Sequence, residues 1–491
     1  MGGGSLVGPR TGVNRCVCGA QSMFNGSLPV SRSKAARRIA QAVLAAVMAL
    51  TGTPSLAQQT PAAGARSGEY LSLDSVKARW PQLDDVQRGM AIEQLISNGA
   101  FDEADQLLGA WKPTRADSVV HARLLLGGLR KAQGRHDEAI EILRNLLTSQ
   151  PKHLRARMEL AHALFLKKED ESARHHFELV LGAASNPDLE TTVRRFIDAM
   201  DQRRSWHFST YVSIAPSTNF NQGANVKTAK LDGLDFSLDE QNRKQSGIGL
   251  MTGVLGGYRL ALTDRLDMVV GGGAHIREFK AESFDDIVAS AEIGPRYRLS
   301  FGDVAAYATV ARRWFGGDAY SMVYGGRLHT MLRLSPRDLV NAGGTCVNKE
   351  HDALVHLDGW HCGSTLAVDH AIDAAGFIRV LGGFERERTQ RAHLDYDGWN
   401  AGFGVYREMP FGISVYGQLL YTHRNYEGVY PTSREAREDE RIDATAHFTK
   451  RDWRIFGLAP MVQYTYTRNL SNIGFHTFDA HSVTTTLTKR F

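Results

Sequence analysis

The sequence predicts an α plus transmembrane β protein, in which tetratricopeptide-like helical repeats precede an antiparallel β-barrel of about 14 strands, of the outer-membrane type. First, residues 204–491 contain segments in which apolar and polar residues alternate, as they do on the two faces of a strand. Second, these segments are joined alternately by short and long connections. Third, residues 71–203 carry a helical repeat. A soluble sandwich explains single strands of this kind, but not the alternation of short and long connections.

Residues 1–57 read as a secretory signal peptide. They contain six Lys or Arg and no acidic residue, and an apolar run at 39–50 follows the last basic residues. Small residues then precede a cleavage site between Ala57 and Gln58. The first 22 residues exceed what such a signal needs, so Met23 is an alternative start.

Charge argues against a nucleic-acid partner. The whole chain has 58 Lys and Arg against 53 Asp and Glu. Six of the basic residues lie in the predicted signal peptide, so the remainder is close to neutral.

After a short linker at 58–70, residues 71–203 are expected to form a periplasmic tetratricopeptide-repeat domain. The alanines Ala104, Ala139 and Ala173 recur at spacings of 35 and 34 residues, where small residues let two antiparallel helices touch. Three such hairpins make a short superhelix with a concave face for peptide or protein segments. The alternative is a spacer that only packs against the barrel.

Residues 204–491 are expected to form the barrel. In the last segment Val483, Leu487 and the terminal Phe491 share one face, and a terminal aromatic residue resembles the signal by which outer-membrane barrels are recognised for insertion. The short connections lie around 263–265, 302–303, 335–338, 372–376, 409–412 and 450–452. The longer ones centre on 217–244, 280–285, 348–354, 389–395, 425–438 and 468–476.

Cys346 and Cys362 flank one of the long connections, so a hairpin brings them opposite one another. A signal peptide routes them to an oxidising compartment, where a disulfide is the natural state. Cys16 and Cys18 leave with the signal peptide, so the cysteine count stays even. We interpret the bridge as structural.

No pattern in the sequence predicts an enzyme, a cofactor or a metal site. We find no nucleophile elbow, phosphate-binding loop, paired zinc cysteines or HExxH motif. The histidines His351, His356, His361 and His370 do not have the spacing of a helical ligand motif.

Several arginines share the polar side of their strands and are expected to face the lumen. They favour anionic cargo only if no opposite charges offset them. These residues are Arg296, Arg298, Arg327, Arg333 and Arg490.

The two-domain layout resembles the surface lipoprotein assembly modulator (Slam) family. The segment 205–223 is similar to that family's first strand and to the Pro-x-x-Asn-x-Asn opening of its first outer loop, here Pro216, Asn219 and Asn221. The resemblance implies an outer-membrane translocator of type XI secretion. Its repeat domain lies in the periplasm and takes a client, either a surface lipoprotein or a secreted haem- or metal-binding protein. Outer-membrane lipids, and the barrel-assembly machinery for insertion, are the other implied partners.

Two alternatives remain at this point. Polysaccharide-export porins also couple tetratricopeptide repeats to a barrel, although their repeat arrays are generally longer. The second alternative is a plain porin or surface receptor in which the repeats serve as an anchor. Export predicts that deleting residues 71–200 abolishes the surface appearance of a specific cargo, whereas a porin retains its solute permeability.

Overall fold

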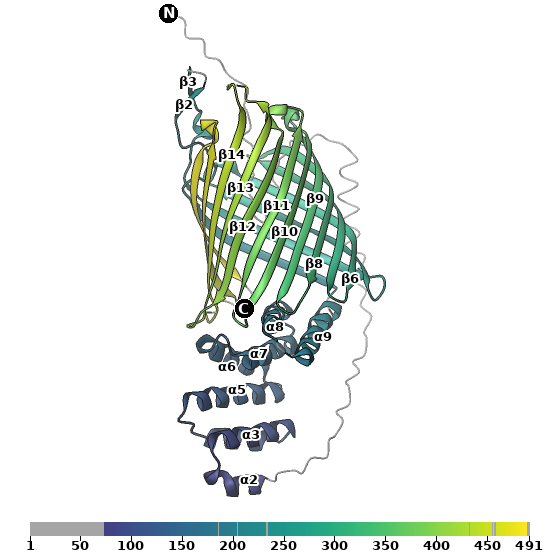
Figure 1. The fold of residues 1–491 in the computed structure, drawn as a ribbon, viewed down its shortest axis with the longest axis vertical. Coiled ribbons are helices and arrows are strands. Elements are labelled where there is room, and N and C mark those ends of the chain that lie inside the picture. Colours follow the sequence, from purple (N-terminus) through teal and green to yellow (C-terminus); the bar gives the residue numbers. More distant parts are fainter. Residues whose placement is uncertain are drawn as a thin grey trace, which may run out of the picture.

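The structure is a computed structural model that describes residues 73–488 apart from 185, 204, 232–233, 432, 454 and 456–457. A column of helices leads into one closed barrel, and the helices lie below the end of the barrel in Figure 1. The predicted signal-cleavage residues Ala57 and Gln58 and the terminal Phe491 lie outside the described residues, so they stay predictions.

The helical part is built of antiparallel hairpins. The repeat alanines Ala104, Ala139 and Ala173 lie on α4, α6 and α8, and all three are fully buried. The turns before these helices contain Gly99, Gly134 and Lys168, each with a positive φ (78°, 77° and 64°), so Lys168 holds the position that glycine takes in the other two repeats. The helices are α2 (Leu73–Arg79), α3 (Asp85–Ser97), α4 (Phe101–Ala110), α5 (Ala116–Ala132), α6 (His136–Ser149), α7 (Leu154–Leu166), α8 (Asp170–Ala183) and α9 (Pro187–Arg203).

The barrel closes with 14 antiparallel strands in the described residues, as the sequence predicts, and β1 pairs with both β4 and β16. A two-stranded hairpin, β2 (Thr228–Leu231) with β3 (Leu234–Ser237), projects from the first outer loop. The barrel strands are β1 (Trp206–Ser217), β4 (Gly247–Ala261), β5 (Leu266–Phe279), β6 (Asp286–Leu299), β7 (Gly302–Phe315), β8 (Asp318–Arg333), β9 (Asp338–His351), β10 (Gly359–Asp373), β11 (Gly376–Thr389), β12 (Tyr396–Glu408), β13 (Ile413–Val429), β14 (Ala436–Lys450), β15 (Ala459–Ser471) and β16 (Phe478–Thr488).

Alternation along each strand separates an apolar outward face from a polar inward face. On β1, Phe208, Val212 and Ile214 are more than half exposed on one face, whereas Ser213 on the other face is buried. Such an outward apolar surface is what a bilayer covers. None of the described helices is long and apolar enough to cross a membrane.

Four of the outer loops share one local structure. Each ends in a short 3-10 turn, and the next residue accepts a hydrogen bond from a backbone N–H at the end of the preceding strand. The accepting residues are Asp285, Asp358, Asp395 and Thr477. Because the side chain satisfies a backbone donor, the loop is held against the strand it leaves.

One connection departs from the expected alternation of short and long. β7 and β8 meet at the outer end through only Gly316 and Gly317, whose φ values are 62° and 84°. Two residues with positive φ make a tight hairpin that twists with its strands, and glycine adopts that conformation without steric cost. This connection is absent from the turns expected from the sequence.

Candidate functional site

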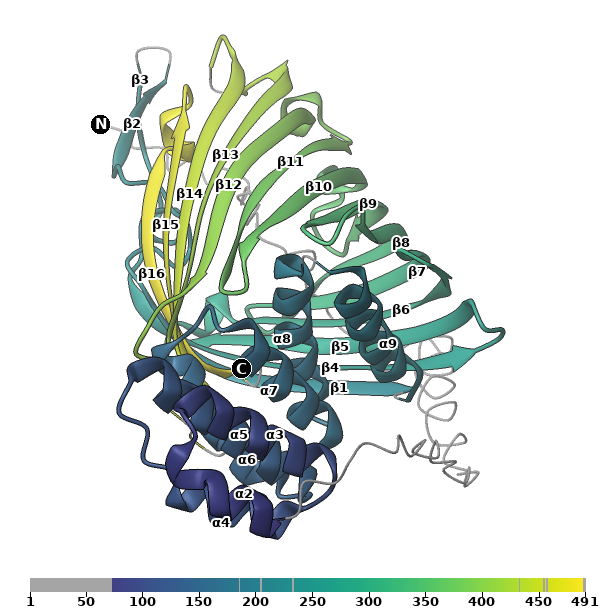
Figure 2. The same cartoon turned by 60° about the horizontal axis from the view of Figure 1, so that its bottom comes forward.

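The candidate functional site is the end of the barrel where the helices join it. Helix α8 packs against side chains that point into the barrel: Leu179 is buried against Tyr406, with Phe377 and Tyr416 partly buried around them. These rings alternate with outward-facing residues such as Phe403, which is half exposed. Helix α8 therefore covers part of the barrel opening, as Figure 2 shows from below.

A close approach of backbones brings α8 onto β10. A Cβ atom added at Gly182 would lie 2.4 Å from the Cβ of Ala371, far closer than two carbon atoms can pack. Any larger residue at position 182 must push the helix away from the strand. Glycine thus sets how tightly the repeat domain seats on the barrel.

A buried charge cluster joins the two domains next to this contact. Arg157 of α7 is completely buried, and its Nη2 lies 2.7 Å from Oε2 of Glu408 at the end of β12. Arg451, in the turn after β14, lies 2.9 Å from the same carboxylate oxygen. Arg157 also donates to the carbonyl of Pro151 at 2.5 Å. One carboxylate therefore holds two guanidinium groups from different domains.

Two histidines and a tyrosine complete this cluster. Nε2 of His175 lies 3.3 Å and the hydroxyl of Tyr406 3.2 Å from Oε1 of Glu408. Nδ1 of His176 lies 3.1 Å from Nη1 of Arg157. Burial, and then the neighbouring Arg157 charge, hold the pKa of His176 well below its usual value. His176 is therefore neutral at physiological pH and accepts the hydrogen bond from Arg157. We call the following six residues the docking cluster: Arg157, His175, His176, Tyr406, Glu408 and Arg451.

Three further contacts fix the repeat domain around the cluster. The backbone N–H of Phe411, in the β12–β13 turn, donates to the carbonyl of Thr148 on α6 at 2.9 Å. Lys152 pairs with Asp373 in the β10–β11 region at 3.1 Å. Arg259 of β4 donates to the backbone carbonyl of Gln202 near the end of α9 at 3.2 Å. The repeat domain is thus attached to the barrel rim at the β12–β13 turn, at the end of β10 and, farther along the strand order, at β4.

Three of the five arginines expected to face the lumen lie beside carboxylates. Arg296 pairs with Asp303 at 2.8 Å and Arg327 with Glu292 at 2.6 Å, and Arg298 lies 3.3 Å from Asp267. Charges paired in this way give no net attraction for anions. The condition stated for anionic cargo therefore does not hold for Arg296 and Arg327, whereas Asp267 is shared between Arg298 and Arg259. Arg333 donates to the carbonyl of Pro336, and Arg490 lies outside the described residues.

The Pro216, Asn219 and Asn221 motif lies at the opposite, outer end of the barrel. Both asparagines are buried. The Asn219 amide donates to the carbonyls of Gly223 and Asp479, each at 2.9 Å, which ties the first outer loop to β16. The Asn221 amide donates to the carbonyls of Gln241 and Arg243 and accepts from the N–H of Gln245. The amides of the motif bond to the loop backbone, so the motif shapes that loop.

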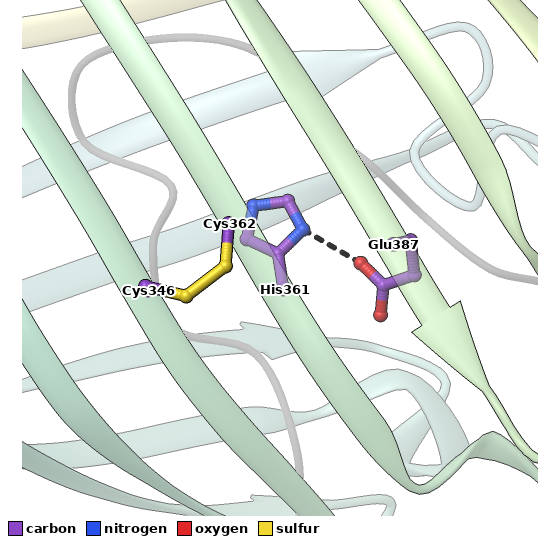
Figure 3. The surroundings of a disulfide bond; sticks show 4 residues. All are labelled: Cys346, His361, Cys362 and Glu387. Carbon is purple, nitrogen blue, oxygen red and sulfur yellow. Dashed lines mark hydrogen bonds and ion pairs between the residues drawn. A yellow bond between two sulfur atoms is a disulfide. The ribbon is translucent and has the colours of Figure 1, made fainter.

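Cys346 and Cys362 form the predicted disulfide, which joins directly opposed residues of β9 and β10 with their Cα atoms 4.1 Å apart (Figure 3). On the next residue, Nδ1 of His361 lies 2.6 Å from Glu387 on β11. Lys349 of β9 also reaches Glu387 at 2.8 Å. Adjacent strands are therefore linked covalently on one face and by an ion-pair network on the other.

The histidines considered as metal ligands are separated in the structure. His351 pairs with Asp358, His361 with Glu387 and His370 with Asp338. Among the described residues no group of three or more His, Cys, Asp or Glu is placed to hold a metal ion.

Sequence reasoning did not identify Arg157, Glu408 or Arg451. A signal for one of them was present: Arg157 lies one turn before Leu160 and Ala161, on the buried stripe of α7. A charge on an apolar helix stripe requires a buried partner. The sequence alone does not say that the partner lies 251 residues away in the barrel.

Comparison with known proteins identifies the family. The family model described as surface lipoprotein assembly modifier matches residues 206–491, and a model of its N-terminal tetratricopeptide repeats matches residues 85–177. Surface lipoprotein assembly modifier 1 of Haemophilus influenzae is 22% identical over 89% of this chain and 91% of its own. Surface lipoprotein assembly modifier 1 of Neisseria meningitidis is 23% identical over 74% of this chain and 75% of its own.

The closed barrel with its apolar outward face, taken with this family, places the chain in the outer membrane, with the repeat domain on the periplasmic side. The resemblance drawn from the domain layout is confirmed by both family models. The chain belongs to the surface lipoprotein assembly modifier family.

Proposed function

We propose that this protein is an outer-membrane translocator that takes a specific client in the periplasm and moves it to the cell surface. The client is a surface lipoprotein, as the family name implies, or a secreted haem- or metal-binding protein. One observation carries the proposal: the repeat domain is seated on inward-facing side chains of the barrel through Leu179 and the docking cluster. A client held by the repeats is then presented at the opening of the barrel.

In this proposal, the helices that are docked on the barrel also control access to its opening. α8 and α9 lie across part of the opening, and in this proposal they move aside when a polypeptide enters there. A barrel of about 14 strands is wide enough for an unfolded segment, because diameter grows with strand number. The paired charges of the lumen suit a hydrated polypeptide better than they suit an acyl chain.

The proposed domain organisation is a signal peptide at 1–57, a linker at 58–70, a repeat domain at 71–203 and a barrel at 204–491. The cleavage site at Ala57 and Gln58 and the insertion signal at Phe491 belong to the same proposal, with the barrel-assembly machinery as the insertion partner. Lipids of the outer membrane surround the barrel. We assign no catalytic residue and no cofactor, because transport by this route requires neither.

The test is surface-protein profiling of cells that carry the full chain, a chain lacking residues 71–200, or one of two single variants. Gly182→Ala places a Cβ 2.4 Å from Ala371 and should disturb docking, whereas Gly128→Ala meets nothing within 4 Å and is the matched control. We expect the deletion to remove one or two proteins from the surface and leave them in the periplasm. Gly182→Ala should show the same defect partially, and Gly128→Ala should not.

The alternatives give different results in the same cells. If protein display is unchanged by the deletion while exopolysaccharide falls, the chain is an export porin. If solute permeability alone depends on the barrel, it is a plain porin or receptor. Either outcome would refute the translocator.

A further inference from the structure

The β12–β13 turn holds an aromatic side chain in a conformation that such residues avoid. Phe411 has a φ of 64°, next to Gly412 with a φ of 68°. Turn positions with positive φ ordinarily carry glycine or asparagine, because a bulky side chain there meets its own backbone. The Phe411 ring is nevertheless 77% exposed, so packing within the protein does not explain its presence.

Hydrogen bonds hold this turn from two sides. The N–H of Phe411 donates to Thr148 of the repeat domain at 2.9 Å, and the Lys450 ammonium donates to the Phe411 carbonyl. The N–H of Arg451 donates to the Gly412 carbonyl at 2.7 Å. The position of the exposed ring is therefore fixed relative to both the barrel and the repeat domain.

The neighbouring β14–β15 turn presents a second exposed apolar group. Trp453 is 62% exposed and Ile455 is 46% exposed. The ammonium of Lys450 lies 5.8 Å from the centre of the Trp453 ring and also pairs with Asp452. Because Lys450 touches both turns, the two aromatic rings and one cation lie together. We call Phe411, Trp453, Ile455 and Lys450 the apolar ledge.

The apolar ledge continues the lipid-facing surface of the barrel. Met409 in the β12–β13 turn, Ile413 at the start of β13 and Phe448 near the end of β14 are exposed as well. Aromatic rings beside a lysine are typical of the level at which acyl chains meet headgroups. Girdles of this kind usually lie on the strands, whereas here the residues lie on two turns, of which the β12–β13 turn is hydrogen-bonded to the repeat domain.

We propose that the apolar ledge inserts into the periplasmic leaflet of the outer membrane and ties the repeat domain to the membrane surface. Phe411, Trp453 and Ile455 contact phospholipid acyl chains, and Lys450 lies at the level of the phosphates. The bond from Phe411 to Thr148 transmits this anchorage to α6. The inference concerns the membrane itself and does not depend on which client the protein carries.

Site-directed spin labelling of the mature chain, in vesicles of phosphatidylethanolamine and phosphatidylglycerol, tests this proposal. Because Cys346 and Cys362 are bonded to each other, an introduced cysteine is the reactive one. Labels at Phe411→Cys and Trp453→Cys are compared with Leu366→Cys on the lipid-facing wall and Val86→Cys on α3. All four native residues are exposed in the structure. Heat-modified gel mobility checks that each variant has folded.

We expect collision with oxygen to exceed collision with a water-soluble nickel chelate at 411 and 453, as at 366, and the reverse at 86. Nickel accessibility at 411 and 453 equal to that at 86 would overturn the proposal. Shielding from both reagents would mean that a client segment or a second copy covers the ledge, which also overturns it.

A conservative variant gives an independent readout. Trp453→Phe should remove part of the tryptophan fluorescence that lipids brominated near the headgroup quench in the wild type. Identical quenching in the two proteins would mean that Trp453 lies away from the leaflet, against the proposal.

Discussion

Replacing Glu408 with Gln should release the repeat domain from the barrel. The carboxylate lies 2.7 Å from Arg157 and 2.9 Å from Arg451, whose side chains are 0% and 9% exposed. Without it, two buried guanidinium groups lack a counter-charge. Breaking a buried pair by removing one partner costs about 3–5 kcal/mol. At about 1.4 kcal/mol for each factor of ten, the docking equilibrium should shift by about two to four powers of ten.

Arg157→Met should have a smaller effect, because Glu408 then keeps Arg451 as its partner. Asp117→Asn is the matched control, since the Asp117–Arg115 ion pair is exposed at both side chains and lies away from the barrel. An exposed pair contributes little that can be measured. The expected order of release is therefore Glu408→Gln first, Arg157→Met second, and no effect for Asp117→Asn.

Electron–electron distance measurement checks this order. Spin labels at Met90→Cys on α3 and Asp264→Cys in the β4–β5 turn report the position of the repeat domain relative to the barrel. We expect one narrow distance in the otherwise unchanged protein and a broad distribution in Glu408→Gln. The reasoning is refuted if Glu408→Gln keeps the narrow distance, or if Arg157→Met releases the domain equally.

Three further predictions concern other parts of the molecule. Asn221→Ala should loosen the first outer loop, because each buried backbone group that loses its partner costs about 1–3 kcal/mol; protease treatment of intact cells should then cut between β1 and β4. Cys346→Ser should lower the unfolding temperature of the barrel without preventing folding, because a bridge across 16 residues contributes about 3 kcal/mol; gel mobility after heating, with and without reductant, checks this. Acid should destabilise the repeat domain. Burial, and then the charge of Lys131, lower the pKa of His162 to about 4 in the folded protein. As the pH falls, the unfolded state therefore binds a proton at His162 before the folded state does. The stability that neutral His162 contributes is present above about pH 6.5 and is lost as pH falls toward 4, by at most about 1.4 kcal/mol per pH unit. Circular dichroism melting at pH 7 and pH 5 measures the loss, and His162→Gln should reduce it.

The sequence carried enough information for the fold because each element has its own periodic signal. Ala104, Ala139 and Ala173 marked the helical hairpins, and all three are buried where helices touch. Cys346 and Cys362 were paired correctly because a hairpin fixes which residues lie opposite. The Gly316–Gly317 turn was missed although two glycines between alternating runs are themselves a hairpin signal.

The docking cluster was beyond sequence reasoning for a different reason. Periodicity shows that Glu408 faces inward and that Arg157 lies on a buried stripe. It does not show which helix lies under which strand, because that depends on the path of the whole chain. The offset of the lumen arginines has the same origin, since Asp267 reaches Arg298 from the adjacent strand and Glu292 reaches Arg327 from two strands away.

The composition of the interface suits a domain that docks reversibly. Its apolar part is small, with Leu179 and Tyr406 as the buried members, and its centre is ionic. A buried ion pair contributes little net stability compared with apolar residues of the same size, because desolvation offsets the attraction. When the domains separate, the charges are hydrated again, whereas a large apolar interface would be left facing water in the lumen. An ionic centre thus fixes one docked position while keeping the free energy of opening low, as the proposed passage of a client past α8 requires.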